Sequence, residues 1–181
     1  MLKGKKVILR SIRKNDINHF LKWCNDPEII QNMYLCLPVS EIAEKKWIEE
    51  ITCSKNDAIF VIEINVKGRP IAIGNCVIKE INWKDRNAEI GIIIGEKKYR
   101  GKGYGPEALM LLISYGFNQL NLHRVWAAIF EFNNKKIPIF QKLGFRKEGC
   151  ARSVIFKNGK YWDITTLSIL EDEWLHKKEK K

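Results

Sequence analysis

The sequence holds few residues of the kinds that bind metal ions or build disulfide frameworks. It has three histidines, which are scattered, and an odd number of cysteines. The cysteines are widely spaced, and no two form a C-x-x-C pair: Cys24, Cys36, Cys53, Cys76 and Cys150. We therefore expect no metal site and no disulfide framework. The same pattern predicts a reduced, cytoplasmic protein.

Long apolar runs are also missing. No stretch approaches the ~18 apolar residues that a membrane-spanning helix needs. The apolar stretch from Val7 to Leu9 is too short for the core of a signal peptide. Hydrophobic residues make up 45% and charged residues 29% of the 181 residues. This composition predicts one globular domain over residues 1–181, with a sizeable core and no membrane contact.

Positive charge exceeds negative charge, with 32 lysines and arginines against 21 acidic residues and a formal net charge of +11. Such an excess fits contact with nucleic acid or the ribosome, an acidic cofactor, or solubility alone. Composition does not choose among these three. The basic end of the chain, residues 176–181, contributes part of the charge and reads as a solvated tail.

Hydrophobic periodicity predicts a strand, two helices, a three-strand meander, a helix, a strand, a helix and a closing hairpin. The meander covers residues 58–64, 71–81 and 88–94, and the later helices cover residues 106–120 and 133–143. Gly144 is placed to end the last helix. Asn158-Gly159 is a strong hairpin turn between strands at 145–156 and 161–170. This order predicts a mixed α/β fold, an α+β sandwich.

The most informative motif is the stretch YRGKGYG, from Tyr99 to Gly105. It joins the apolar run at residues 90–94 to a helix beginning near Pro106. Glycines let a ligand approach backbone N–H groups closely, and a helix N-terminus leaves such groups unpaired. Together they form an anion site suited to phosphate or pyrophosphate. Basic side chains add charge beside it: Lys97, Lys98, Arg100 and Lys102.

The spacing of the glycines excludes two common phosphate sites. Pro106 stands where a P-loop or a dinucleotide fingerprint needs its last glycine. The pattern that fits is R-x-x-G-x-G, formed by Arg100, Gly103 and Gly105. This pattern resembles the acetyl-CoA signature of the GNAT N-acetyltransferase superfamily. By itself it is equally consistent with a lysine-rich surface turn whose glycines cap a helix.

The resemblance extends along the chain and is closest to the ribosomal-protein and spermidine N-acetyltransferase branches. It implies a mixed, mostly antiparallel central sheet with helices on both faces. It rests on Leu9-Arg10 with Asp16, Arg86-Asn87-Ala88-Glu89-Ile90-Gly91, the YRGKGYG turn, Leu122 to Val125, Asn133, Lys142-Leu143-Gly144-Phe145, Glu148-Gly149, and Asn158-Gly159-Lys160-Tyr161 with Asp163.

The resemblance implies that acetyl-CoA is the co-substrate and that its acetyl group passes directly to a primary amine in a ternary complex. The pantetheine arm would pair with the strand before the turn, and Asn133 would lie against the cofactor unless it only caps a helix. The implied cofactor-binding residues are Ile92, Ile93, Ile94, Arg100, Gly101, Lys102, Gly103, Tyr104, Gly105 and Asn133. No covalent nucleophile is needed, so Cys76 and Cys150 read as packing residues.

Glu89 is the predicted general base, acting through water. It opens an apolar strand, and partial burial would make it a better proton acceptor near neutral pH. The alternative is that Glu89 only pairs with Arg86 or a lysine. The general acid is open, because Phe140 stands where many relatives carry a tyrosine and a phenyl ring donates no proton.

Three classes of acceptor fit the resemblance. They are a protein N-terminus (for example that of a ribosomal protein), a polyamine, and another small amine. The net positive charge disfavours a polycation, because like charges repel. Acidic residues on expected helices could reverse this locally, or could simply be solvated: Glu28, Glu41, Glu49 and Glu50. Relatives also suggest a homodimer and ribosome association. The alternative function is a noncatalytic module of this fold that binds CoA or RNA.

Overall fold

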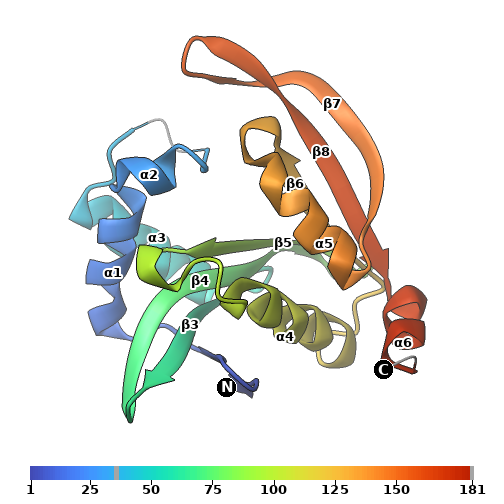
Figure 1. The fold of residues 1–181 in the computed structure, drawn as a ribbon, viewed down its shortest axis with the longest axis horizontal. Helices are drawn as coiled ribbons and strands as arrows, with labels where there is room; N and C mark the ends of the chain where they lie inside the picture. Colours follow the sequence, from blue (N-terminus) through green and yellow to red (C-terminus); the bar gives the residue numbers. More distant parts are fainter. Residues whose placement is uncertain (35–36, 180–181) are drawn as a thin grey trace. The chain divides into compact units, whose positions relative to one another are not determined.

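The computed structural model describes residues 1–34 and 37–179 (Figure 1). Its strands are β1 (Leu2–Lys3), β2 (Ile8–Arg10), β3 (Ala58–Val66), β4 (Arg69–Asn82), β5 (Asn87–Ile94), β6 (Arg124–Phe130), β7 (Arg146–Lys157) and β8 (Lys160–Leu170). Its α-helices are α1 (Ile17–Cys24), α2 (Pro27–Ile30), α3 (Glu41–Cys53), α4 (Tyr104–Asn118), α5 (Ile137–Leu143) and α6 (Glu171–Glu179). Short 3-10 helices are η1 (Lys14–Asp16), η2 (Lys97–Tyr99) and η3 (Glu131–Lys136).

The chain forms two compact units. The first contains Met1–Lys79 and Gly91–Ile113, and the second contains Glu80–Ile90 and Ser114–Lys181. In the first unit the strand order is β1-β2-β3-β4-β5, and in the second it is β5-β6-β8-β7. None of the described helices is long and apolar enough to cross a membrane.

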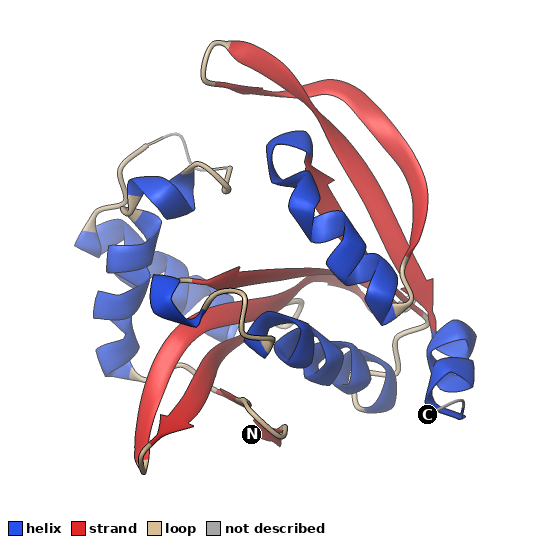
Figure 2. Cartoon of the chain, in the orientation of Figure 1, coloured by secondary structure: helices blue, strands red, loops and turns tan. Residues whose placement is uncertain are grey.

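The strand pairing confirms a mixed, mostly antiparallel sheet. Pairs β1–β2, β2–β3 and β3–β4 are antiparallel, as are β6–β8 and β7–β8. Strands β5 and β6 run parallel, with Asn87 opposite Arg124 and Glu89 opposite Trp126. Strands β7 and β8 form the long hairpin of the second unit (Figure 2). Its turn residues Asn158 and Gly159 have φ of 52° and 78°, which confirms the predicted tight turn.

Helices cover both faces of the sheet in the first unit, as the alternation of side chains along β5 shows. Ile93 packs against the apolar cluster that contains Phe20 and Trp23 of α1. A Cβ on Gly105 at the start of α4 would lie 3.9 Å from Ile92 Cδ1 and 3.7 Å from Ile94 Cγ1. Successive strand residues point to opposite faces. Strand β5 therefore presents one isoleucine to the α1 side and its two neighbours to α4.

Two predicted helix boundaries are wrong, for local reasons. Helix α4 begins at Tyr104, because Gly103 has φ of 84° and only the following residues continue the helix. Helix α5 begins at Ile137, because Asn133 has φ of −126° and ψ of 23°, outside the helical region. Pro138 lies in the first turn of α5, where proline is tolerated. Gly144 ends the helix with φ of 104°, as predicted.

A buried cluster of charges joins the beginning of the chain to β3. The guanidinium of Arg10 donates from NH1 to Asp16 Oδ2 at 2.7 Å and from NH2 to Asp16 Oδ1 at 2.9 Å. Its Nε donates to the carboxylate of Glu63. All three residues are buried. Leu9-Arg10 and Asp16 are part of the family pattern, and the structure gives them this structural role.

Candidate functional site

The YRGKGYG turn presents backbone N–H groups at the N-terminus of α4. Gly101 and Gly103 have φ of 72° and 84°, a left-handed conformation that favours glycine. The first helical hydrogen bond runs from Glu107 N to Gly103 O at 3.4 Å. The N–H groups before Glu107 have no carbonyl one turn earlier in the helix to accept them. They lie at the positive end of the helix dipole, where the sequence predicts an anion site.

The side chain of Arg100 ties this turn to the end of β5. Its Nε donates to Ile94 O at 2.9 Å, and NH2 lies 3.4 Å from Gly95 O. These two hydrogen bonds use the guanidinium to hold the turn in shape. Lys97 is also engaged, with its Nζ 3.2 Å from Asp26 and 3.0 Å from Glu28. Two of the four predicted basic side chains therefore have structural partners.

The other two basic side chains of the turn, Lys98 and Lys102, surround an aromatic ring. Their Nζ atoms lie 4.9 Å and 5.7 Å from the centroid of Tyr99, within reach of a cation–π interaction. Tyr99 in turn meets Tyr104 edge to face, with 6.1 Å between ring centroids. The rings and lysines form a basic, aromatic margin beside the glycines.

Lys6 is a basic residue at the turn that the sequence analysis missed. Its Nζ lies 3.5 Å from the position that a Cβ on Gly103 would take. Its backbone N donates to Glu107 Oε1 at 2.7 Å, which attaches this segment to the first turn of α4. The N-terminal lysines carry no spacing signal, so only the folded chain identifies Lys6 as a neighbour of the anion site.

Trp23 of α1 holds the end of β5 from the other side. Any side chain on Gly95 would overlap the indole ring of Trp23. The indole Nε1 donates to Glu96 Oε1 at 3.1 Å, and Lys22 Nζ donates to the same oxygen at 2.7 Å. This contact fixes the strand end from which the turn departs.

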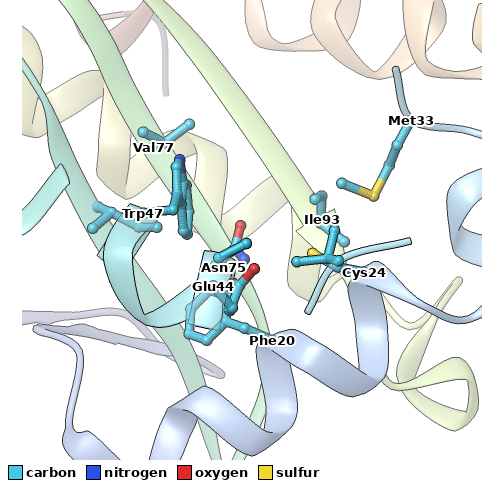
Figure 3. Close-up of a pocket in the computed structure, with 11 residues that line it drawn as sticks. Phe20, Cys24, Met33, Glu44, Trp47, Asn75, Val77 and Ile93 are labelled. Carbon is cyan, nitrogen blue, oxygen red and sulfur yellow. The ribbon is translucent and has the colours of Figure 1, made fainter. Parts of the chain in front are cut away.

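A cavity of about 390 Å³ lies in the first unit beside Ile93 of β5. Its described walls come from α1, α3 and the sheet, and Figure 3 shows Glu44 and Asn75 between Trp47 on one side and Cys24 on the other. Its lining residues are Phe20, Cys24, Met33, Val39, Ala43, Glu44, Trp47, Ile59, Asn75, Val77 and Ile93. The cavity and the glycine turn thus both adjoin strand β5. The volume of the cavity is typical of small-molecule pockets.

Glu44 is the charged residue of this cavity. It is only 4% exposed, and its Oε1 is buried without a hydrogen-bond partner among the described residues. Burial raises the pKa of its carboxyl group above the ordinary value. Burial, and next the charge of Glu44, raise the pKa of the Cys24 thiol to about 12. The thiol is therefore protonated at neutral pH and is no nucleophile.

The acidic residues that the sequence analysis singled out are partnered or exposed. Glu28 pairs with Lys97, Glu41 with Lys45, and Glu50 with Lys46. Glu49 is exposed on α3. Glu44 also lies on α3, and its neighbours in the sequence are no more apolar than those of Glu41, Glu49 and Glu50. Its burial depends on packing against α1 and β4.

Two predicted site residues lie in the second unit. Glu89 is half-buried in β5. Arg86 donates to Asn121 and Glu171 through its guanidinium. Both roles of Glu89, general base and pairing with Arg86 or a lysine, stay predictions. Asn133 lies in η3, and the N-cap of α5 is Lys136, so the helix-cap alternative for Asn133 is wrong. Its cofactor contact stays a prediction.

Phe140 is a core residue. It is 2% exposed and meets Phe145 edge to face, with 5.1 Å between the ring centroids. This packing accounts for an apolar ring at this buried position. It supplies no general acid.

We expect Phe140→Leu to lower the free energy of unfolding by about 1 kcal/mol, the usual value of such an aromatic pair. Turnover should persist, and Phe140→Tyr, which adds a proton donor, should retain or raise it. Urea unfolding and steady-state kinetics test both. If Phe140→Leu abolished turnover while folding and acetyl-CoA affinity were intact, the packing interpretation would be wrong.

Comparison with known proteins agrees with this geometry. The model of an acetyltransferase (GNAT) domain matches residues 6–146. The chain is 30% identical over 173 residues to the SPbeta prophage-derived uncharacterized N-acetyltransferase YokL of Bacillus subtilis (strain 168), covering 94% of this chain and 93% of that one. It is 27% identical to the spermidine N(1)-acetyltransferase of Vibrio cholerae, covering 96% and 98%.

A solved structure shows the same fold. The crystal structure of spermidine N-acetyltransferase from Vibrio cholerae in complex with CoA and spermine superimposes with a TM-score of 0.88 at 25% identity. The match covers 95% of this chain and 99% of that one. The predicted fold class, a mostly antiparallel mixed sheet with helices, is therefore confirmed.

Proposed function

Because the chain belongs to the GNAT acetyltransferase family, we propose that it moves an acetyl group from acetyl-CoA to a small primary amine, using the turn and cavity of the first unit. The protein is an acetyl-CoA-dependent N-acetyltransferase by family and by relatives. The alternative of a noncatalytic binding module is not favoured, because spermidine N-acetyltransferases match over nearly the whole chain.

The observation that carries the proposal is the glycine turn at the start of α4. Backbone N–H groups from Gly101 to Gly105, with Lys102 and Lys6 beside them, suit the pyrophosphate of CoA. The peptide-like pantetheine arm would then extend along the backbone of Ile92–Ile94. Asn133 is proposed as a further cofactor contact.

The proposed reaction needs a neutral amine, a polarised thioester carbonyl and a proton for the departing thiolate. The amine nitrogen forms a bond to the acetyl carbon, and the carbon–sulfur bond of the thioester then breaks. Glu89, through water, takes the proton that the ammonium group loses to become a neutral amine. The nitrogen releases a second proton to solvent water as the amide forms. The thiolate of CoA takes up a proton from solvent water, so no side-chain acid is assigned.

The acceptor is a small amine in this proposal, as in the relatives that are named spermidine acetyltransferases. A protein N-terminus as acceptor, ribosome contact and a homodimer are further proposals, and the net charge of +11 is compatible with ribosome contact. We also propose a cytoplasmic location. In support, the four described cysteines are free, while Cys36 lies outside the described residues.

We expect Gly103→Val to weaken acetyl-CoA binding by tenfold or more, about 1.4 kcal/mol or above. The branched side chain would stand where the phosphate approaches and would be strained at φ of 84°. Gly68→Val is the matched control, because Gly68 has φ of 82°, open space around it and a place in the β3–β4 turn.

Isothermal titration calorimetry of both variants measures the effect, and thiol release with a panel of primary amines measures turnover. Strain alone would affect the folding of both variants equally. Unchanged acetyl-CoA affinity in a folded Gly103→Val protein would contradict the proposed site. Absence of thiol release with every amine would contradict the proposed reaction.

A further inference from the structure

The cavity beside Ile93 has a composition that restricts what it can bind. Its described lining contains one carboxylate, Glu44, together with the amide of Asn75 and the thiol of Cys24. The remaining walls are apolar, and the largest are Trp47 and Phe20, whose ring centroids lie 6.3 Å apart. An aromatic wall of this kind suits a cation and an apolar group equally well.

The state of Glu44 is a second observation, independent of the cavity lining, that points to a cationic ligand. A carboxylate that is 4% exposed, with a buried oxygen that accepts no hydrogen bond from the described residues, lacks the partner that buried charges normally have. A ligand ammonium group would supply that partner as a charge-assisted hydrogen bond. The cavity therefore has one place for one positive charge.

We infer that the acceptor of this cavity is a primary monoamine with a bulky apolar body, aromatic or branched, whose ammonium group is held by Glu44. The inference rests on the proposed N-acetyltransferase function and specifies its substrate class. Glu44 attracts the amine as a cation, and the apolar body packs on Trp47 and Phe20.

A polyamine fits the same lining less well. Each additional ammonium group of a polyamine needs its own carboxylate or water, and an unpaired buried charge is strongly unfavourable. The described lining offers no second carboxylate. The acids on the neighbouring helix surface, Glu41 and Glu50, already pair with lysines. The chain should therefore differ in acceptor from its spermidine-acetylating relatives.

The first test is Glu44→Gln, which keeps the shape of the side chain and removes its charge. We expect KM for 2-phenylethylamine to rise roughly 10- to 100-fold, the usual range for a hydrogen bond to a charged group. The turnover number and acetyl-CoA affinity should change little. Glu41→Gln, an exposed position on the same helix, is the control and should leave KM unchanged. An unchanged KM in Glu44→Gln would overturn the inference.

A thermal readout separates recognition from a structural role. If Glu44 stabilised the fold, Glu44→Gln would melt at a lower temperature. An unpaired buried carboxylate opposes folding, so we expect the variant to melt at the same or a higher temperature. A lower melting temperature together with a raised KM would show only a loosened cavity and would also overturn the inference.

The second test compares amines on the unaltered protein. We expect kcat/KM for 2-phenylethylamine to exceed that for methylamine and for spermidine by about tenfold or more, because the apolar body contributes binding and extra charges do not. Efficient acetylation of spermidine, with a KM that Glu44→Gln leaves unchanged, would refute the acceptor class and leave N-acetyltransfer standing. If no amine released CoA, both would be refuted.

Discussion

Replacing Glu89 by glutamine should lower kcat about 100- to 10,000-fold at neutral pH, the range that a general base contributes. Glutamine keeps the shape of the side chain but cannot take a proton from the amine. Glu89 is half-buried in β5, so its carboxylate is partly shielded and water can still reach it to relay the proton. Acetyl-CoA affinity should persist, because the proposed cofactor site lies at the glycine turn and does not include Glu89.

The pH dependence of this deficit provides the sharper measurement. At high pH more of the amine is already neutral, and the difference in kcat between Glu89→Gln and the unaltered enzyme should shrink. Glu49→Gln, an exposed carboxylate on α3, controls for the loss of one negative charge. Near-normal turnover of Glu89→Gln at neutral pH would remove Glu89 from proton transfer and leave it a positional role.

The effects of Glu89 and Glu44 should separate in the kinetics. A group that acts on the transition state lowers kcat, whereas a group that binds the ground state and the transition state equally changes KM. Glu89→Gln should therefore act on kcat and Glu44→Gln on KM. If the two variants gave the same pattern, the division of roles between them would be wrong.

Replacing Arg10 by methionine should lower the free energy of unfolding by about 3–5 kcal/mol, the usual result of removing one partner of a buried ion pair. The change would leave the carboxylate of Asp16 buried without its cation, and Glu63 with only the exposed Arg13 at 3.8 Å. Equilibrium urea unfolding measures it. In the triple variant Arg10→Met, Asp16→Asn, Glu63→Gln, the three buried charges are removed together, and most of the loss should be recovered. A triple variant as unstable as the single one would show that the shape of Arg10 matters more than its charge.

The same cluster makes the free energy of unfolding depend on pH. Burial alone would raise the pKa of Asp16, but hydrogen bonds from Arg10 and from the backbone of Arg13, with the charge of Arg10, hold it below its ordinary value. A carboxyl group whose pKa is lower in the folded state stabilises the fold above its unfolded pKa, about 3.9. This contribution disappears as pH falls through the lower folded value. Asp16→Asn should therefore flatten the acid limb of a stability profile.

Local features of this chain were readable from the sequence because neighbouring residues determine them. The apolar, β-branched runs of the central strands, the hairpin at Asn158-Gly159 and the helix end at Gly144 all follow from local sequence and short-range sterics. The glycine turn is also a local feature, since its glycines and the strand and helix on either side are contiguous in sequence. The order of these elements predicted the fold class, and the residue patterns along the chain carried the resemblance to the family.

Tertiary structure decided which polar residues are buried, because burial depends on contacts with segments distant in sequence. The acidic residues of α3 look alike in sequence, yet packing against α1 and β4 buries Glu44 alone among them and leaves Glu41 paired with Lys45 at the surface. Lys6 lies beside Gly103 only because the segment between β1 and β2 is attached to Glu107 of α4, and Phe140 is identified as a packing residue only by its contact with Phe145. Long-range packing thus decides which side chains line the cavity and which surround the glycine turn.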